Sequence, residues 1–470
     1  MAKRSLEDLL RESGNPAKLL RNQKTGPNVY PGVPPEFTNW RDEQAAWQKT
    51  CVLFNQSYHM ADLAVEGPDA LKLLSHLGIN SFANFTVDKA KQFVPCSYDG
   101  YVIGDVILFH LAENSFNLVG RIPALNWVRF HAETGGYDVK VELDERSAAR
   151  PDPFNRKSYR FQVQGPNAVK VVEKATGRPA PELKFFNMTT IEIAGKKVRA
   201  LRHGMAGQPG YELFGPWAEG EAVREALVKA GEEFGLLQVG GRAYSSNTLE
   251  SGWVPSPLPA VYTGESMKAF REWLTEDSYE AKASIGGSFA SGNIEDYYLT
   301  PWDLGYGHVL KFDHDFIGRE ALEARAKQPH RKKVTLALEN EDVIRVFASQ
   351  LEKGDGRGKF MEFPSAVYSM HPYDKVITGN GKTVGISTWV GYSSNERKML
   401  TLAILEEEYA QPGQEVIFVW GEENGGTAKP TVEPHRQMEI RAIVSPVPYV
   451  ETVRKTYVEG GWRAAGGPSA

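Results

Sequence analysis

The sequence predicts an α+β fold of more than one domain, followed by an all-β barrel or sandwich at the C-terminal end. The first observation is length, because 470 residues suffice for about two or three domains. Second, short strand-like and helix-like runs alternate without the regular strand–helix–strand repeat of a doubly wound sheet. Third, strand patterns predominate beyond the charged stretch KQPHRKK. We expect two intertwined subdomains in 1–328, a β domain at 329–455 and a tail at 456–470.

The N-terminal part of the chain indicates helices, a turn-rich segment and then two strands. Leucines at helical spacing predict short helices within Ser5–Arg21, broken near Gly14. Gly26–Pro35 is rich in turn residues, and Trp40–Thr50 again has a helical pattern. Cys51–Val65 predicts a strand, a polar interruption and a second strand.

The middle of the chain continues this alternation of strands and helices. Apolar residues recur there at helical spacing in some runs, and other runs are short, apolar and bounded by turn residues. The predicted elements are a helix at Asp69–Leu77, strand–turn–strand at Phe93–Phe109, a strand at Ser115–Val119, a helix at Trp127–Glu133, a strand at Tyr159–Gln164, a helix at Ala168–Ala175, a hairpin at Ile191–Arg202 and a helix at Glu219–Phe234.

A polar stretch, Gly240–Pro259, follows these elements. Its Ser and Asn side chains compete with helix by bonding to nearby backbone, and its prolines end any helix that forms. It also contains Arg242, Tyr244, Glu250 and Trp253. The stretch is therefore either a connecting loop with a short helical turn or the wall of a functional site.

The C-terminal region has the pattern of an all-β domain. Its strand-like runs are separated by turn signals such as Gly379–Gly381. The predicted strands are Val334–Leu338, Asp374–Ile377, Thr383–Trp389, Leu400–Leu405, Glu415–Trp420 and Gln437–Ala442. A barrel and a sandwich are both compatible with this spacing.

Composition narrows the class of protein. The net charge is −5 with the two signs interspersed, which argues against a nucleic-acid binder. Two isolated cysteines, Cys51 and Cys96, indicate a reducing compartment and no disulfide framework. The charged N-terminus is not a secretory signal, and no apolar run approaches the length of a membrane span. We expect a cytoplasmic protein that binds neither nucleic acid nor membrane.

Familiar catalytic motifs are absent from the sequence. It has no convincing phosphate loop, no HExxH and no GxSxG. The histidines His203, His314 and His435 do not form a recognisable metal-binding set, so we expect no metal. The residues alone indicate a soluble multi-domain protein and favour an enzyme.

Several stretches together resemble the glycine-cleavage T-protein (aminomethyltransferase) superfamily. They cover most of residues 50–325, and the last matches over the most consecutive positions. The stretches are KQFVPCSYDGYVIGD at Lys91–Asp105, FQVQGP at Phe161–Pro166, GQPGYEL at Gly207–Leu213 and YGHVLKFDHDFIGREAL at Tyr306–Leu322.

One branch of the superfamily is similar nearly end to end. NVYPGVPPEFTNWRDEQAAW, LRHGMAGQPG, RAYSSNTLESGWVPSPLPAVYTG, IGGSF and WGEENGG resemble the tetrahydrofolate-dependent aryl O-demethylases of vanillate, 3-O-methylgallate and syringate. The resemblance implies transfer of a methyl group from an aromatic methoxy substituent to N5 of tetrahydrofolate. The products would be 5-methyltetrahydrofolate and a phenol, in the catabolism of lignin-derived aromatics.

The sequence departs from the wider superfamily at its acidic pair. Where T-proteins carry two adjacent acidic residues, this chain has Gly104 and Asp105. A catalytic aspartate serving an amine substrate is therefore doubtful. The demethylase branch, as the resemblance implies, relies on a tyrosine, and Tyr244 occupies the matching place.

The implied chemistry needs an acid, because breaking an aryl methyl ether expels a phenoxide. A tyrosine has a pKa of about 10, close to that of the leaving phenol, so proton transfer is nearly thermoneutral. Tyr244 is our candidate. Arg121 could stabilise the tyrosinate or hold a substrate oxygen, and His59 could relay the proton. A surface arginine and a structural histidine are the alternatives.

The remaining candidates bind ligands. Glu212 resembles the superfamily's pterin-binding glutamate, since a carboxylate can accept from the pterin amino and ring N–H groups. Trp253 is a candidate to stack on the cofactor and Tyr30 on the substrate, although either could be core packing. Gln56 and Tyr58 are further substrate candidates. Strand alternation puts them on the opposite face from His59 unless the strand bulges.

Two other functions remain open. One is a folate-dependent demethylase of an aliphatic methylated amine or sulfonium compound, against which the missing carboxylate and the tyrosine weigh. The other is a folate-binding regulatory or iron–sulfur-assembly protein of the same fold, for which the sequence offers no comparable cysteine motif.

Overall fold

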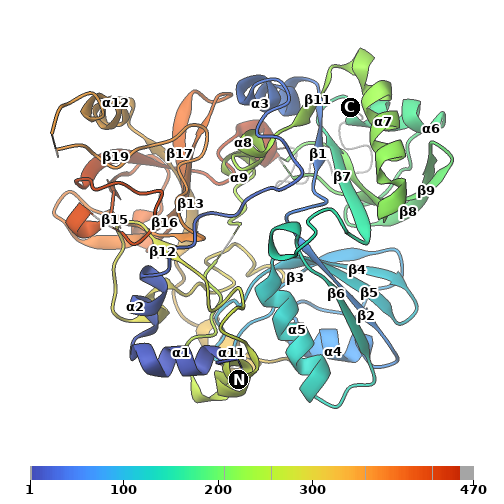
Figure 1. Cartoon of the computed structure of the whole chain (residues 1–470), viewed down its shortest axis with the longest axis horizontal. Coiled ribbons are helices and arrows are strands. Elements are labelled where there is room, and N and C mark those ends of the chain that lie inside the picture. The colour runs from blue at the N-terminus through green and yellow to red at the C-terminus, as the bar shows by residue number, and fades with distance from the viewer. Residues whose placement is uncertain (1–2, 206, 256, 355, 426, 456–470) are drawn as a thin grey trace.

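Two β-sheets and a closed β-barrel form the framework of this computed structural model (Figure 1). The structure describes residues 3–205, 207–255, 257–354, 356–425 and 427–455. The barrel lies on the left of the view, and the two sheets lie on the right, one above the other. In the described part of the chain, no helix is long and apolar enough to cross a membrane. The predicted tail at 456–470 is outside the described residues.

The upper sheet has six strands, and its two faces differ in chemistry. Apolar residues of alternate positions pack beneath helices α6 (Ala168–Thr176) and α7 (Gly220–Gly231). The opposite face carries the polar residues described below. In sheet order the strands are β11 (Leu236–Val239), β1 (Cys51–Asn55), β7 (Ser158–Gln164), β10 (Gly210–Pro216), β9 (Lys196–Arg202) and β8 (Met188–Ile193).

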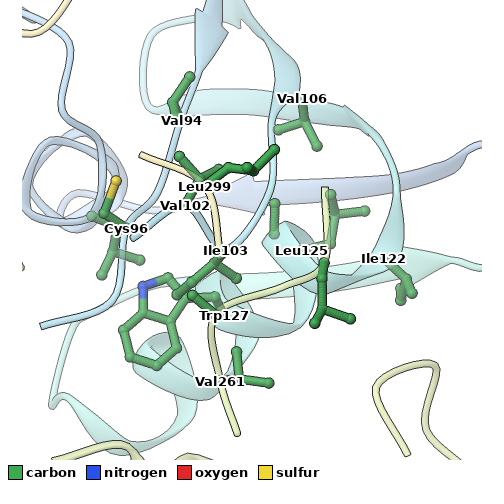
Figure 2. Close-up of a cluster of buried hydrophobic side chains, with 14 of the residues drawn as sticks. Val94, Cys96, Val102, Ile103, Val106, Ile122, Leu125, Trp127, Val261 and Leu299 are labelled. Carbon is green, nitrogen blue, oxygen red and sulfur yellow. The ribbon is translucent and has the colours of Figure 1, made fainter. Parts of the chain in front are cut away.

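The lower sheet has five strands and shares one large core with the helices around it. Figure 2 shows part of this core, where Val102, Ile103 and Val106 meet Ile122 and Leu125. The strands in order are β3 (Ala90–Phe93), β4 (Val106–Ala112), β5 (Ser115–Gly120), β2 (Ala61–Glu66) and β6 (Lys140–Asp144). The helices are α1 (Leu6–Ser13), α2 (Pro16–Arg21), α4 (Ala70–Leu77), α5 (Ile122–Thr134), α10 (Lys268–Trp273) and α11 (Arg319–Arg325).

The C-terminal strands close into a barrel, which decides between the two predicted alternatives. Each of the six predicted strands is confirmed, and helix α12 (Asn340–Ser349) was not predicted. The barrel order is β13 (Lys332–Leu338), β17 (Lys398–Leu405), β16 (Thr383–Ser393), β15 (Asp374–Ile377), β18 (Glu415–Trp420) and β19 (Met438–Ser445). A short parallel pair, β12 (Ile285–Gly286) and β14 (His371–Pro372), joins the barrel region to the rest of the chain. Helix α13 (Glu451–Val453) follows the barrel. The boundary at 328 stays a prediction.

The predicted strand–turn–strand at Phe93–Phe109 is wrong in its middle. Strand β3 ends at Phe93 and β4 begins at Val106, and the intervening backbone bonds to other segments. The amide of Val102, for example, donates to the carbonyl of Leu299 at 2.8 Å. The strand β10 was not predicted, although it carries Glu212.

A chain of buried ion pairs joins the two sheets. Arg160 of β7 pairs with Glu212 of β10 and, at 3.2 Å, with Asp62 of β2. Asp62 pairs with Arg156 at 3.1 Å, and Arg156 pairs with Asp144 of β6 at 2.9 Å. The five side chains are almost fully buried, so each charge depends on its partners for compensation.

We expect Arg156→Ala to lower the free energy of unfolding by about 3–5 kcal/mol, because it leaves the buried carboxylates of Asp62 and Asp144 with one cationic partner fewer. Chemical denaturation measures this loss. Lys268→Ala is the control, since its pair with Glu265 at 3.7 Å is exposed and should be worth about 0–1 kcal/mol. Equal denaturation midpoints for the two variants would contradict the account.

Candidate active site

The polar face of the six-stranded sheet is the base of the candidate site. Strand pairing puts Gln162 opposite Glu212, and the next position on the same face of β7 is Gln164. Gln56 lies just beyond β1, and its backbone amide donates to the carbonyl of Arg160 at 2.9 Å. These positions alternate with apolar ones, so the sequence FQVQ sends its glutamines to one face and its apolar residues to the other.

The hydroxyl of Tyr244 is bonded from two sides. It lies 2.9 Å from Nε2 of His59, and the amide nitrogen of Gln56 donates to it at 3.3 Å. Which of Tyr244 and His59 donates depends on the tautomer of the histidine, and with Nε2 unprotonated the hydroxyl of Tyr244 donates to it. The ring of Tyr30 lies edge-on to the rings of both Tyr244 and His59, each at 5.2 Å between centroids.

Burial sets the protonation of this cluster. It raises the pKa of the Tyr244 hydroxyl well above its usual value, and a nearby charge, Arg121, opposes the shift. Burial, and then the positive charge of Arg121, lower the pKa of His59 to about 3. At neutral pH the tyrosine therefore holds its proton and the histidine is uncharged, so the pair presents one transferable proton.

The stretch that carries Tyr244 is clamped between the barrel and the N-terminal region. It forms two short helices, α8 (Gly241–Tyr244) and α9 (Asn247–Ser251). The buried carboxylate of Glu250 accepts from Trp47 of α3 (Trp40–Lys49) at 2.7 Å and from Ser393 of β16 at 2.7 Å. The indole of Trp389, at a bulge in β16, donates to the carbonyl of Ser245 at 2.8 Å. The stretch thus forms short helical turns and borders the candidate site at Tyr244.

A turn after β1 brings Gln56 and His59 to the same tyrosine. The strand ends at Asn55 and the following residues turn, so strand alternation does not separate the two side chains. Tyr58 does not join them. Its ring packs against Trp217 at 5.6 Å and Phe154 at 6.0 Å between centroids.

Arg121 lies between strand β5 and helix α5, and its Nε donates to the carbonyl of Pro255 at 2.8 Å. Burial raises the pKa of Tyr30, and the charge of Arg121 opposes that shift as it does for Tyr244. A fixed cation beside a phenol stabilises the phenoxide form. Arg121 is thus close enough to influence both tyrosines.

Glu212 is held by Arg160, whose guanidinium packs against the rings of Phe109 and Phe214, 4.9 and 4.6 Å from their centroids. Around it, four buried polar atoms have no hydrogen-bond partner among the described residues. They are Gln56 Oε1, Gln162 Oε1, Gln164 Nε2 and His203 Nδ1. Each such group costs about 1–3 kcal/mol when left unpaired. A flat ligand with several donors and acceptors would satisfy them, and the pterin of tetrahydrofolate fits that description.

Trp253 lies at the other side of the site, next to Asp105. Its indole nitrogen donates to Oδ2 of Asp105 at 2.8 Å, and the side chain remains 38% exposed. An exposed indole with a bonded nitrogen offers its ring face to a ligand.

Sequence reasoning missed three contributors. Gln162 and Gln164 could have been found, because two glutamines at alternate positions of an apolar strand are unusual. Met205, whose sulfur lies 3.8 Å from the hydroxyl of Tyr244, gave no signal in the sequence. A cavity of about 420 Å³ lies elsewhere, between the 289–303 segment and β16, and none of these residues lines it.

Comparison with known proteins gives consistent matches. A family model described as the GCVT N-terminal domain matches residues 21–256. A syringate O-demethylase from Sphingobium sp. is 63% identical over 463 residues, covering 98% of this chain and 99% of that protein. A sesamin methylene transferase from Sinomonas sp. is 30% identical over 421 residues, covering 84% and 85%. The crystal structure of glycine cleavage system aminomethyltransferase T from Bartonella henselae has a TM-score of 0.61 and 19% identity, covering 94% of this chain and 96% of that one, which shows a shared fold.

The lowered pKa of His59 predicts a specific pH dependence of stability. The unfolded chain takes up a proton on this histidine below about pH 6.5, whereas in the folded protein His59 stays unprotonated down to about pH 3. His59 therefore destabilises the fold progressively as the pH falls through that window. We expect His59→Gln to lose less thermal stability than the parent between pH 7 and pH 5.

The control for this measurement is His308→Gln, because His308 is exposed. It should change the pH dependence of the melting temperature very little. An identical pH dependence for His59→Gln and the parent protein would show that His59 is not buried in its neutral form.

Proposed function

The chain belongs to the GCVT aminomethyltransferase family, and we propose that it is a tetrahydrofolate-dependent O-demethylase of methoxy-substituted aromatic acids of the syringate class. The relative named syringate O-demethylase, similar over nearly the whole chain, supports this proposal. The observation that carries the chemistry is the half-buried hydroxyl of Tyr244, bonded to His59 and Gln56. The comparisons do not favour an aliphatic methylated substrate.

Glu212 and the unpaired amides of the sheet face would hold the pterin of tetrahydrofolate, and Trp253 would stack on it. When bound, the cofactor supplies N5 as the nucleophile that accepts the methyl group. The protein's own residues must protonate the oxygen from which the methyl group leaves. Tyr30 and Gln56 lie next to Tyr244, so the aromatic substrate would bind between these side chains with its methoxy oxygen at the hydroxyl.

Tyr244 acts as the acid. As the bond between the methyl carbon and the aryl oxygen breaks, the phenoxide oxygen gains the electron pair and takes the proton of Tyr244. The tyrosinate left behind accepts from Gln56 and is stabilised by the charge of Arg121. Burial raises the pKa of Tyr244. It also raises the pKa of the phenol that forms in the same site, so the two pKa values stay close and proton transfer stays nearly thermoneutral. His59 then returns a proton from solvent to Tyr244, which balances the proton that N5 of the cofactor would release to solvent on methylation.

The other expected properties also belong to this proposal. The partners are a small methoxyaromatic substrate and tetrahydrofolate. A cytoplasmic location fits the two buried, unpaired cysteines. Tyr58 stays a prediction as a substrate contact, one that requires the Phe154 side of the site to take part in binding.

We expect the protein to convert syringate and tetrahydrofolate to a phenol and 5-methyltetrahydrofolate, and Tyr244→Phe to lower kcat by about 100-fold or more. The variant lacks only the hydroxyl, so folate binding should persist. Chromatography of the folates measures turnover, and calorimetry measures binding. If no methoxybenzoate yields methylated folate, the proposed function is wrong; near-parental turnover by Tyr244→Phe would remove it as the acid.

We expect Glu212→Gln to weaken tetrahydrofolate binding by about tenfold or more, because a charged acceptor is replaced by a neutral one. Gln keeps the shape next to Arg160. Glu433→Gln is the control, since Glu433 lies beyond β18 and accepts from the backbone of Phe360 on the barrel. An unchanged dissociation constant for Glu212→Gln would contradict the assignment of Glu212.

A further inference from the structure

We propose that Asp105 is a positioning residue, which fixes the indole of Trp253 as a rigid platform for the bound cofactor and takes no part in proton transfer. Asp105 follows Gly104 and directly precedes strand β4. The inference rests on the proposed function for the identity of the ligand, and on the geometry below for the role of the carboxylate.

One oxygen of Asp105 accepts from three donors that belong to three separate segments. Oδ2 lies 2.8 Å from the amide of Gln92 in β3, 2.8 Å from the indole of Trp253 and 2.5 Å from the hydroxyl of Tyr306. A carboxylate oxygen has about two lone pairs, so this oxygen is fully engaged. It gathers the three segments at one point.

Trp253 is therefore fixed at two places. Its indole nitrogen is bonded to Asp105, and its backbone carbonyl accepts from the hydroxyl of Thr248 in α9. Yet Trp253 is 38% exposed, more than Gln92 and Tyr306, the other two donors to Asp105. An exposed ring that cannot rotate has already lost its side-chain entropy before a ligand stacks on it.

The backbone of Asp105 is equally rigid. Its neighbours Val102, Ile103 and Val106 are buried in the core that also holds Ile122 of α5 (Figure 2). A side chain at Gly104 would meet Cβ of Ala124 in α5 at 3.3 Å, closer than ordinary contact. The backbone at Gly104 therefore packs closely against α5, and any side chain there would require a shift of a few tenths of an ångström.

The three donors that Oδ2 of Asp105 accepts from suit an anchor. Burial raises its pKa, whereas the bonds from Tyr306 and Trp253 and the charges of Lys333 and Arg121 oppose that shift. Lys333 is the second residue of the barrel strand β13, and its amine donates to the carbonyl of Leu304 at 2.9 Å. Tyr244 and His59 meanwhile supply the hydrogen-bonded proton of the site without any bond to Asp105.

The test compares Asp105→Ala with Asp105→Asn in the full-length protein. The alanine variant removes the carboxylate and leaves the indole nitrogen only the hydroxyl of Tyr306, at 3.1 Å. We expect its dissociation constant for tetrahydrofolate to rise about tenfold, with kcat at saturation within about threefold of the parent. Asparagine keeps a carbonyl oxygen that can face the donors, so it should restore most of the affinity. In protein labelled with ¹⁵N-indole tryptophan, the Trp253 resonance, assigned by its loss in Trp253→Phe, should move upfield in Asp105→Ala.

Asp342→Ala is the matched control, because Asp342 is a buried carboxylate that accepts from the backbone and guanidinium of Arg441 in the barrel. It should lose stability without a change in folate affinity. Asp105→Asn losing turnover as Tyr244→Phe does, at unchanged folate affinity, would overturn the proposal. So would an Asp105→Ala variant with an unmoved Trp253 resonance. If the parent makes no methylated folate, the proposed function fails, while the indole resonance still tests the anchor.

Discussion

The ion pair between Arg160 and Glu212 is the contact on which the site depends. Arg160 is buried at the junction of the two sheets, and it is paired there with a carboxylate from each of them. An arginine in that place is tolerable only with both partners, because an uncompensated buried charge is very costly. The same requirement holds the carboxylate of Glu212 on the polar face of β7 and β10, beside amide groups that have no partner among the described residues.

The segment that carries Tyr244 is held in place by the hydrogen bonds of Glu250. Glu250 binds α3 and the barrel to the segment between them, so three parts of the chain that are far apart in sequence meet at one residue. The bonds of Glu250 fix the position of Tyr244, and His59 contacts Tyr244 from a turn after β1. The barrel therefore contributes to the site by holding this segment, although it supplies none of the proposed catalytic side chains.

Much of the fold could be predicted from local patterns, because strands bounded by turn residues and amphipathic helices leave clear periodicities. The strand with Glu212 was missed, since its flanking glycines and prolines resemble a loop. The convergence of Tyr244 and His59 could not be predicted, because no local pattern records contacts between residues 185 positions apart. Alternation along an ideal strand predicted that Gln56 and His59 lie on opposite faces. This was wrong, because β1 ends at Asn55, one residue before Gln56. The three hydrogen bonds to Asp105 could not be predicted from the sequence for the same reason.

The central claim is that the hydroxyl of Tyr244 protonates the oxygen from which the methyl group leaves. A crystal structure of the protein with tetrahydrofolate and syringate tests it most directly. The account predicts a methoxy oxygen within about 2.6–3.2 Å of the Tyr244 hydroxyl, with its methyl carbon directed at N5. A methoxy group bound out of reach of Tyr244, with another donor at its oxygen, would contradict the account.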